Sequence, residues 1–233
     1  MEYNFFIRKN GGKLSIFITF EGIEGCGKTT QIGLLTAVFE KSKRSFLLTR
    51  EPGGTEAGER IREILLSSKK IRLDPMAELL LYAAARIQHY IEVIQPALRE
   101  GKIVLCDRFA DATLAYQGFG RGLDIDWIEE IHRRAINNLK PDITFLLDLP
   151  VEEGLRRAWI RIKNSKGIRT QKINPDYYQL EFPFHLIHAD QDRFEKEAID
   201  FHQKVREGYL TLARQEPGRI IILDGMKDEQ TLH

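Results

Sequence analysis

Residues 20–31, FEGIEGCGKTTQ, constrain the fold more than any other part of this 233-residue chain. Gly22, Gly25 and Gly27 cost conformational entropy on folding, so they are favoured where the backbone must approach something closely. The spacing from Gly22 to the following GKT tripeptide matches the phosphate-binding loop of nucleotide-binding proteins. In such a loop, backbone N–H groups and a helix N-terminus surround phosphate oxygens, and the lysine reaches the terminal phosphates.

The loop pattern requires a strand before it and a helix after it, and the sequence predicts both. Residues 16–20, IFITF, form a short apolar run typical of a strand buried in a parallel sheet. From Thr29 onward, Ile32, Leu35, Val38 and Phe39 recur at helical spacing and share one face. We therefore expect a true phosphate site.

The rest of the chain alternates strand patterns with helix patterns. Buried-type strands are expected at 45–50, 102–107, 143–149 and 219–224, and amphipathic helices at 56–67, 75–101 and 124–138, with a bend near Pro96. This alternation predicts an α/β fold with a five-stranded parallel sheet covered by helices on both faces. Ligands then bind at the carboxyl ends of the strands, where Gly22, Arg50, Asp107 and Asp148 fall.

The composition limits the class of protein and its partners. With 42% hydrophobic and 30% charged residues, residues 1–233 suit a single compact domain. Lysine and arginine total 35 against 34 acidic residues, which gives no broad basic field for nucleic acid or membrane. The cysteines, Cys26 and Cys106, form no CxxC pair and favour a reducing, cytoplasmic location. Residues 1–15 are expected to be a ragged extension, too weakly apolar for a signal peptide.

One segment does not fit the alternation. Residues 163–189 are polar at first, contain Pro175 and Pro183, and then become rich in aromatic residues. A loop this long inside a compact domain is usually functional or mobile. Of the histidines, His89 and His132 are expected at the surface of amphipathic helices, and the pair at 185 and 188 is only a weak candidate for metal binding.

Five segments together resemble the bacterial thymidylate kinases. They are FEGIEGCGKTTQ, TREPGGT, LLLYAAARIQH, DRFADATLAYQGFGRG and DRFEKEAIDFHQKVREGYLTLA, and they occur in that family's order from residue 16 to about residue 224. The resemblance implies a P-loop kinase fold with a lid segment at about 154–190. It also implies transfer of the γ-phosphoryl group of ATP to dTMP, which gives dTDP, with Mg²⁺ as cofactor. The family forms homodimers through long helices, so a homodimer is expected, with no nucleic acid or membrane partner.

The resemblance assigns the ATP side of the site. Lys28 would reach the terminal phosphates as a catalytic residue, and Thr29 and Asp107 would hold Mg²⁺. The full ATP-binding set it implies is Gly22, Ile23, Glu24, Gly25, Cys26, Gly27, Lys28, Thr29 and Thr30.

It also assigns the dTMP side. Arg108 and Arg50, with Arg62, would clamp the acceptor phosphate, because a guanidinium pairs two oxygens at once. Glu24 would accept from the sugar 3′-hydroxyl or approach the metal. Around the base, Arg86 would donate to thymine O4 and Tyr82, one turn earlier, would stack on the ring. The remaining implied contacts are Thr113 at the base edge, Tyr116 at the sugar 2′ position, and Gln117.

The lid would supply the arginine that stabilises the transferring phosphoryl group, because the phosphate loop contains none. By the family's pattern this role falls to Arg157 and Arg161, one turn apart on a helix, while Arg156 points elsewhere. Arg169, in the insertion, is a rival.

Two other functions stay open at this stage. One is a kinase of another nucleoside monophosphate or of a deoxynucleoside, against which TREPGGT and AYQG argue. The other is a regulatory P-loop NTPase, which would need switch loops and a water-positioning group that the sequence does not offer.

Overall fold

A computed structural model describes residues 8–10, 13–66, 72–165 and 197–233. Its centre is a parallel sheet of five strands: β2 (Lys13–Glu21), β3 (Phe46–Arg50), β4 (Ile103–Asp107), β5 (Ile143–Asp148) and β6 (Ile220–Asp224). The strand order is β3-β4-β2-β5-β6, and every pair along it is parallel. The predicted five-stranded parallel sheet is therefore confirmed.

The N-terminal extension contains a strand that the sequence analysis did not predict. Strand β1 (Arg8–Asn10) pairs antiparallel with the start of β2, with Arg8 opposite Ser15. The expectation of a ragged extension over 1–15 is wrong for these residues. Residues 8–10, RKN, are polar and have no alternating apolar pattern, so the sequence did not indicate that their backbone pairs with β2.

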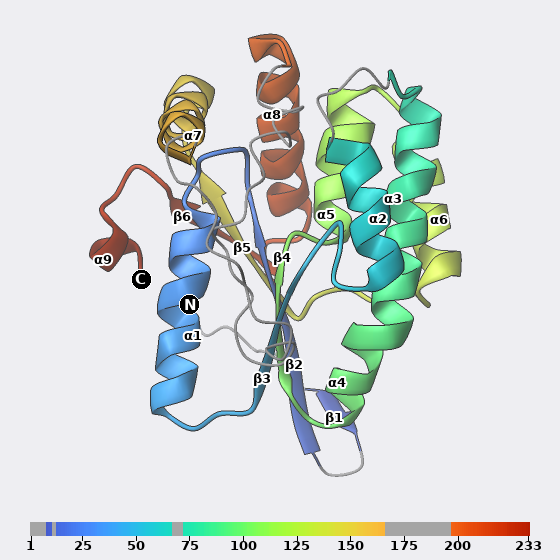
Figure 1. The fold of residues 1–233 in the computed structure, drawn as a ribbon, viewed down its shortest axis with the longest axis vertical. Helices are drawn as coiled ribbons and strands as arrows, with labels where there is room; N and C mark the ends of the chain where they lie inside the picture. Colours follow the sequence, from blue (N-terminus) through green and yellow to red (C-terminus); the bar gives the residue numbers. More distant parts are fainter. Residues whose placement is uncertain (1–7, 11–12, 67–71, 166–196) are drawn as a thin grey trace.

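Helices cover both faces of the sheet, as predicted. Figure 1 shows α1 (Lys28–Lys41) on one side of the sheet, and α2 (Glu56–Leu66), α3 (Pro75–His89) and α4 (Gln95–Arg99) on the other. The remaining helical segments are η1 (Tyr90–Ile94), α5 (Ala110–Thr113), η2 (Leu114–Gly120), α6 (Ile125–Ala135), α7 (Val151–Ser165), α8 (Ile199–Gln215) and α9 (Glu229–Leu232).

The long helical pattern over 75–101 folds as three consecutive segments, α3, η1 and α4. Pro75 is its first helical residue, and the Asp74 side chain accepts a hydrogen bond from the Met76 amide at 2.8 Å. The π-helical segment η1 ends two residues before Pro96, which has no N–H group to continue the α-helical ladder. The bend expected near Pro96 stays a prediction; what the structure has there is a π-helical segment followed by a short α-helix.

The core follows from the two-residue periodicity of β2. Ile18 and Phe20 belong to one buried cluster, which also holds Ile32 of α1 and Val205 of α8. Phe17, which points the opposite way, belongs to a second cluster with Ile94, Ala97 and Leu98. Both faces of the central strand are therefore buried, which fixes its register against β4 and β5.

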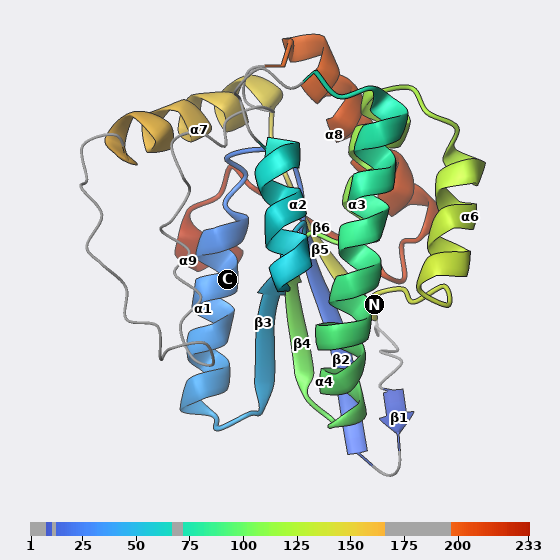
Figure 2. The same cartoon turned by 45° about the vertical axis from the view of Figure 1, so that its right-hand side comes forward.

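The carboxyl ends of the parallel strands meet at one edge of the sheet. Figure 2 shows α7 and α8 above this edge, with β1 at the opposite end of β2. Most of the insertion predicted at 163–189, including Arg169 and the histidines at 185 and 188, lies outside the described residues. Among the helices of the described ranges, none is long and apolar enough to cross a bilayer.

Candidate active site

A cavity of about 820 Å³ opens at the carboxyl edge of the sheet. It brings together residues from the phosphate loop, from α2, α3, β4, α5 and η2, and from α7. The predicted site residues that line it are Glu24, Gly25, Cys26, Gly27, Lys28, Thr29, Thr30, Arg62, Tyr82, Arg86, Asp107, Arg108, Thr113, Tyr116, Gln117, Arg157 and Arg161. Of the other predicted residues, Gly22, Ile23 and Arg50 are not in the cavity wall.

The phosphate loop runs from the end of β2 into α1 with backbone angles that favour glycine. Gly25 has φ +70°, and a Cβ atom there would lie 2.1 Å from the carbonyl oxygen of Gly154. Gly27 has φ +100° and directly precedes the first residue of α1. These glycines therefore allow the loop to curl over the helix N-terminus and to pack against the start of α7.

Lys28 folds back over its own loop. Its Nζ donates to the carbonyl oxygens of Gly22 and Ile23, each at 3.1 Å, and to the Cys26 Sγ at 3.4 Å. The side chain is buried, yet it lines the cavity. The ammonium is therefore held by acceptors of its own loop, on the wall of the cavity.

Asp107 ends β4 beside the loop and offers an oxygen to the cavity. Its Oδ1 is buried and has no hydrogen-bond partner among the described residues. The Thr29 hydroxyl belongs to the same cavity wall. No cluster of three or more His, Cys, Asp or Glu ligands exists in the described ranges. Mg²⁺ does not need one, since it is usually held by one or two protein oxygens with waters and phosphates.

Arg108 is surrounded by groups that hold its guanidinium in one place. Its Nη1 donates to the Tyr209 hydroxyl at 3.1 Å, and its Nη2 donates to Glu24 Oε1 at 3.3 Å. The guanidinium also stands 4.9 Å from the centre of the Tyr116 ring. The Arg108 backbone has φ +70°, an unusual angle for a residue with a side chain, of the kind that clusters at functional sites.

Glu24 is a buried, ionised carboxylate. It accepts from the Tyr116 hydroxyl at 2.6 Å, and His202 Nδ1 lies 3.3 Å from its other oxygen. Burial raises the pKa of Glu24, but the His202 ring, the Arg108 charge and the Tyr116 hydroxyl together lower it to about 2. Glu24 is thus tied to Arg108 and Tyr116, so its placement on the acceptor side is favoured over an exposed position in the loop.

Glu21 was not predicted, although it lies directly beneath this cluster. It accepts from the Phe109 amide and from the Tyr209 hydroxyl, both at 2.7 Å. Burial and the charge of Asp111 raise its pKa to about 7, against the lowering effects of Arg108 and of these two hydrogen bonds. Tyr209 therefore links Glu21 to Arg108 through a single hydroxyl.

Arg62 reaches the cavity from α2, and Arg50 stands behind it. Burial and the charge of Arg50 lower the pKa of Arg62 to about 10, so Arg62 is still cationic at neutral pH. Arg62 Nη1 donates to the Pro52 carbonyl at 2.9 Å, whereas Arg50 Nη2 pairs with Glu59 at 2.8 Å. Together with Arg108, they concentrate positive charge on this side of the cavity.

Arg86 is almost completely buried and has several partners. Its Nε donates to Glu51 at 2.7 Å, and its Nη2 donates to Thr113 Oγ1 at 2.8 Å and to the Phe109 carbonyl at 3.1 Å. Its Nη1 lies 2.6 Å from His132 Nε2. Burial and the Arg86 charge lower the pKa of His132 to about 2, so the ring is neutral and accepts from Arg86.

The predictions for two histidines are therefore wrong. His132 and His89 were expected at the surface, but they are 7% and 0% exposed. His89 Nδ1 lies 3.0 Å from Glu51 Oε1, and its Nε2 lies 2.6 Å from Thr49 Oγ1. Both rings support the buried Arg86–Glu51 pair, with partners about 40 residues away in the sequence.

Two of the lid arginines reach the cavity from α7, and a third does not. Arg157 Nη1 donates to the Gly225 carbonyl at 2.9 Å, and its Nε donates to Glu153 at 2.7 Å. Arg161 lines the cavity one turn further along the helix. Arg156 pairs with Glu153 on the exposed side and lies outside the cavity wall. The structure therefore separates these three residues as the helical spacing predicts.

The segment after β6 also lines the cavity and was not predicted. The lining residues from this segment include Gly225, Met226, Lys227, Asp228 and Glu229. Gln31 of α1 donates to the Glu229 carbonyl at 3.0 Å. Its position after the last parallel strand was the available signal, because that loop must lie at the ligand-binding edge.

One cavity holds a phosphate loop, a buried aspartate oxygen and a side rich in arginine. On this α/β sheet, these features define a P-loop kinase whose phosphoryl acceptor is itself anionic. The sequence profile of the thymidylate kinases matches residues 20–179, well over half of the chain. The chain belongs to the thymidylate kinase family.

Individual relatives agree over most of their length. The chain is 53% identical over 213 residues to the thymidylate kinase of Geotalea daltonii, which covers 91% of this chain and 90% of that protein. It is 52% identical over 209 residues to the thymidylate kinase of Trichlorobacter lovleyi, with 90% and 89% covered. The crystal structure of thymidylate kinase from Ehrlichia chaffeensis matches with a TM-score of 0.65 and 33% identity, over 90% of this chain and 92% of that chain. The chain is thus a kinase that phosphorylates dTMP with ATP.

Proposed function

We propose that the chain transfers the γ-phosphoryl group of Mg-ATP directly to the phosphate of dTMP within the single cavity, for dTTP synthesis. The observation that carries this proposal is that the phosphate loop and the acceptor arginines line the same cavity. The acceptor phosphate has a second pKa of about 6 and is mostly a dianion at neutral pH, so no general base is needed. The task is to bring two polyanions together, which calls for positioning and for cancellation of charge.

On the donor side, residues 22–30 hold the ATP phosphates. The backbone N–H groups of the loop and the N-terminus of α1 face the phosphates, and the ammonium of Lys28 turns from its loop carbonyls toward the terminal ones. Thr29 and Asp107 would hold Mg²⁺, and the buried, unpartnered Oδ1 of Asp107 suits that cation. Bound Mg²⁺ would supply positive charge to the phosphate oxygens.

On the acceptor side, Arg108 clamps the dTMP phosphate. Its guanidinium is already oriented by Tyr209, Glu24 and the Tyr116 ring, so little entropy is lost when the phosphate binds. Arg62 adds charge from α2, with Arg50 behind it. Glu24 faces the sugar, and Tyr116 excludes a 2′-hydroxyl by its bulk.

The base lies beside α3 and η2. Tyr82 stacks on it, and Arg86 donates to O4. Within the described residues, four of the five N–H donors of Arg86 go to Glu51, Phe109, Thr113 and His132, which leaves one Nη1 hydrogen for the base. Cytosine would present an amino donor to this hydrogen and would be rejected.

The lid completes the site. Arg157 and Arg161 stabilise the charge that develops on the transferring phosphoryl group, because both line the cavity beside the phosphate loop. The proposal also covers the organisation of the whole chain. Residues 1–233 form one domain that pairs as a cytoplasmic homodimer, supported by the exposed apolar side chains of Ile64, Met76 and Leu80 on α2 and α3 and by two free cysteines.

A panel of nucleoside monophosphates with ATP tests this proposal, with Mg²⁺ present or removed by a chelator. We expect dTDP from dTMP only with Mg²⁺, a several-fold lower kcat/KM for dUMP and negligible turnover of dCMP. The 5-methyl group contributes about 0.8 kcal/mol, or roughly fourfold, so dUMP should still react. Equal turnover of dCMP and dTMP would refute the role of Arg86. ATP hydrolysis without transfer to any monophosphate would instead favour a regulatory NTPase.

A further inference from the structure

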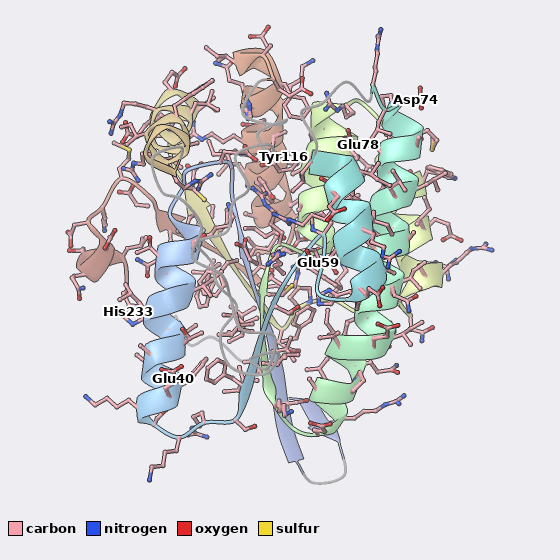
Figure 3. All side chains as sticks on the ribbon, viewed as in Figure 1. Glu40, Glu59, Asp74, Glu78, Tyr116 and His233 are labelled. Carbon is pink, nitrogen blue, oxygen red and sulfur yellow. The ribbon has the colours of Figure 1, made fainter. Side chains whose placement is uncertain are left out.

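A second buried glutamate holds the amide of Gln117. The Gln117 Nε2 donates to Glu78 Oε1 at 2.8 Å, and the two side chains are 1% and 0% exposed. Figure 3 labels Glu78, which belongs to α3, and Tyr116, which belongs to η2. Gln117 is the next residue of η2. Gln117 also lines the cavity, four residues after Thr113, which accepts a hydrogen bond from Arg86. The glutamate thus contacts the cavity through another side chain.

This contact fixes which end of the Gln117 amide faces the cavity. A carboxylate accepts hydrogen bonds and cannot donate them, so Glu78 must face the amide nitrogen. Arg121 Nε also donates to this Glu78 oxygen, at 3.4 Å, so the glutamate accepts from both of these neighbours. The amide oxygen, Oε1, is then the end left for a ligand, and within the described ranges no residue donates to it.

We propose that Glu78 is a specificity-determining positioning residue, which orients Gln117 so that its Oε1 accepts the N3–H of thymine. The proposal rests on the placement of the base beside Arg86 given above. Glu78 itself does not touch the substrate.

The chemistry of the base edge explains why the orientation matters. Thymine presents an acceptor at O4 next to a donor at N3, whereas cytosine presents a donor at N4 next to an acceptor at N3. The remaining Arg86 hydrogen and the Gln117 oxygen match thymine at both positions and oppose cytosine at both. Each reading group is held by its own buried glutamate, Glu51 for Arg86 and Glu78 for Gln117. A flipped Gln117 would present its NH₂ group and would suit cytosine N3.

The substitution Glu78→Gln tests this inference, because an amide at position 78 can pair with either orientation of Gln117. We expect the ratio of kcat/KM for dTMP to that for dCMP to fall by about tenfold or more, since a well-placed contact to a base edge gives discrimination of that order. The ratio of dTMP to dUMP should stay within about twofold, because uracil has the same O4 and N3–H as thymine. Each ratio compares two substrates on one preparation, so partial unfolding cancels. Glu78→Asp, which remains acceptor-only, should keep the wild-type selectivity.

The matched control is Glu197→Gln. Glu197 pairs with Arg121 Nη2 at 2.5 Å, and in the described part of the chain the Gln117 amide bonds to Glu78 and not to Glu197. The substitution therefore perturbs the same arginine without freeing the amide. An equal loss of selectivity in Glu197→Gln would show that the effect runs through Arg121, and would overturn the inference.

The variant Gln117→Met separates this inference from the proposed site. If Gln117→Met lowers the dTMP/dCMP ratio and Glu78→Gln adds nothing in that background, the inference stands. If Gln117→Met lowers the ratio but Glu78→Gln alone leaves it unchanged, the role of Glu78 is refuted while the site stands. If Gln117→Met has no effect on the ratio, the placement of the base beside Gln117 fails, and the inference fails with it.

Discussion

Replacing Tyr209 with phenylalanine should weaken binding of the dTMP phosphate specifically. The Tyr209 hydroxyl, on α8, donates to Glu21 at 2.7 Å and accepts from Arg108 at 3.1 Å, and the residue is 3% exposed. Hydrogen bonds to charged groups contribute about 1.5–3 kcal/mol. The substitution removes both contacts, but Arg108 keeps its hydrogen bond to Glu24. We therefore expect the free energy of dTMP binding to weaken by about 2 kcal/mol, or roughly thirtyfold in affinity.

The assay compares two ligands that differ only in the phosphate. Calorimetric titration of Tyr209→Phe with dTMP and with thymidine should show dTMP weakened by roughly thirtyfold and thymidine by less than about twofold. Tyr90→Phe is the matched control, because Tyr90 also has a hydrogen-bonded hydroxyl, to Gln95 at 2.8 Å, but lies outside the cavity. Equal weakening of both ligands would mean that Tyr209 only supports the fold. Unchanged dTMP affinity would mean that Arg108 does not depend on it.

Three further predictions concern the pH dependence of stability and the lid. The pKa of Glu24 is lowered to about 2, so its stabilising contribution is present above about pH 4.5 and is lost as the pH falls toward 2. In denaturant titrations, the difference in unfolding free energy between the wild type and Glu24→Gln should therefore shrink by about 3 kcal/mol across that range. A difference that stays constant with pH would contradict this prediction. The pKa of Glu21 is raised to about 7, so the sign is opposite: stability falls as the pH rises from about 4.5 to 7, and Glu21→Gln should remove that decline. Arg157→Ala and Arg161→Ala should each lower kcat by roughly a thousandfold or more with little change in KM, while Arg156→Ala serves as the exposed control. If only Arg169→Ala loses activity, the insertion supplies the catalytic group instead.

The sequence predicted those parts of the site that depend on local patterns. The phosphate loop needs a strand, glycines and a helix in consecutive positions, and all of these can be read from residues 16–39. Asp107 ends a buried strand and Arg108 follows it, so the predicted parallel sheet placed both residues at the carboxyl edge. The family resemblance pointed to Arg157 and Arg161, and helical spacing then put the two on one face.

The missed residues depend on contacts between distant parts of the chain. Tyr209 and Glu21 are 188 residues apart, and Arg86 and His132 are 46 apart, so neither pair has a local signature. A histidine on an amphipathic helix can lie at the surface or in the core. His89 and His132 lie in the core because they contact buried partners, Glu51 and Arg86 respectively. Glu78 likewise reads as an ordinary helix residue until its amide partner on η2 is known.

The most direct test of the central claim is binding of a dinucleotide in which adenosine and thymidine are joined through a polyphosphate chain. If donor and acceptor occupy one cavity in line for direct transfer, this compound should compete with both ATP and dTMP and bind more tightly than either, because it pays the entropy of association once. Lys28→Met and Arg108→Met should each weaken it. Competition with only one of the two substrates, or affinity no better than that of ATP, would contradict a single cavity that holds both nucleotides for direct transfer.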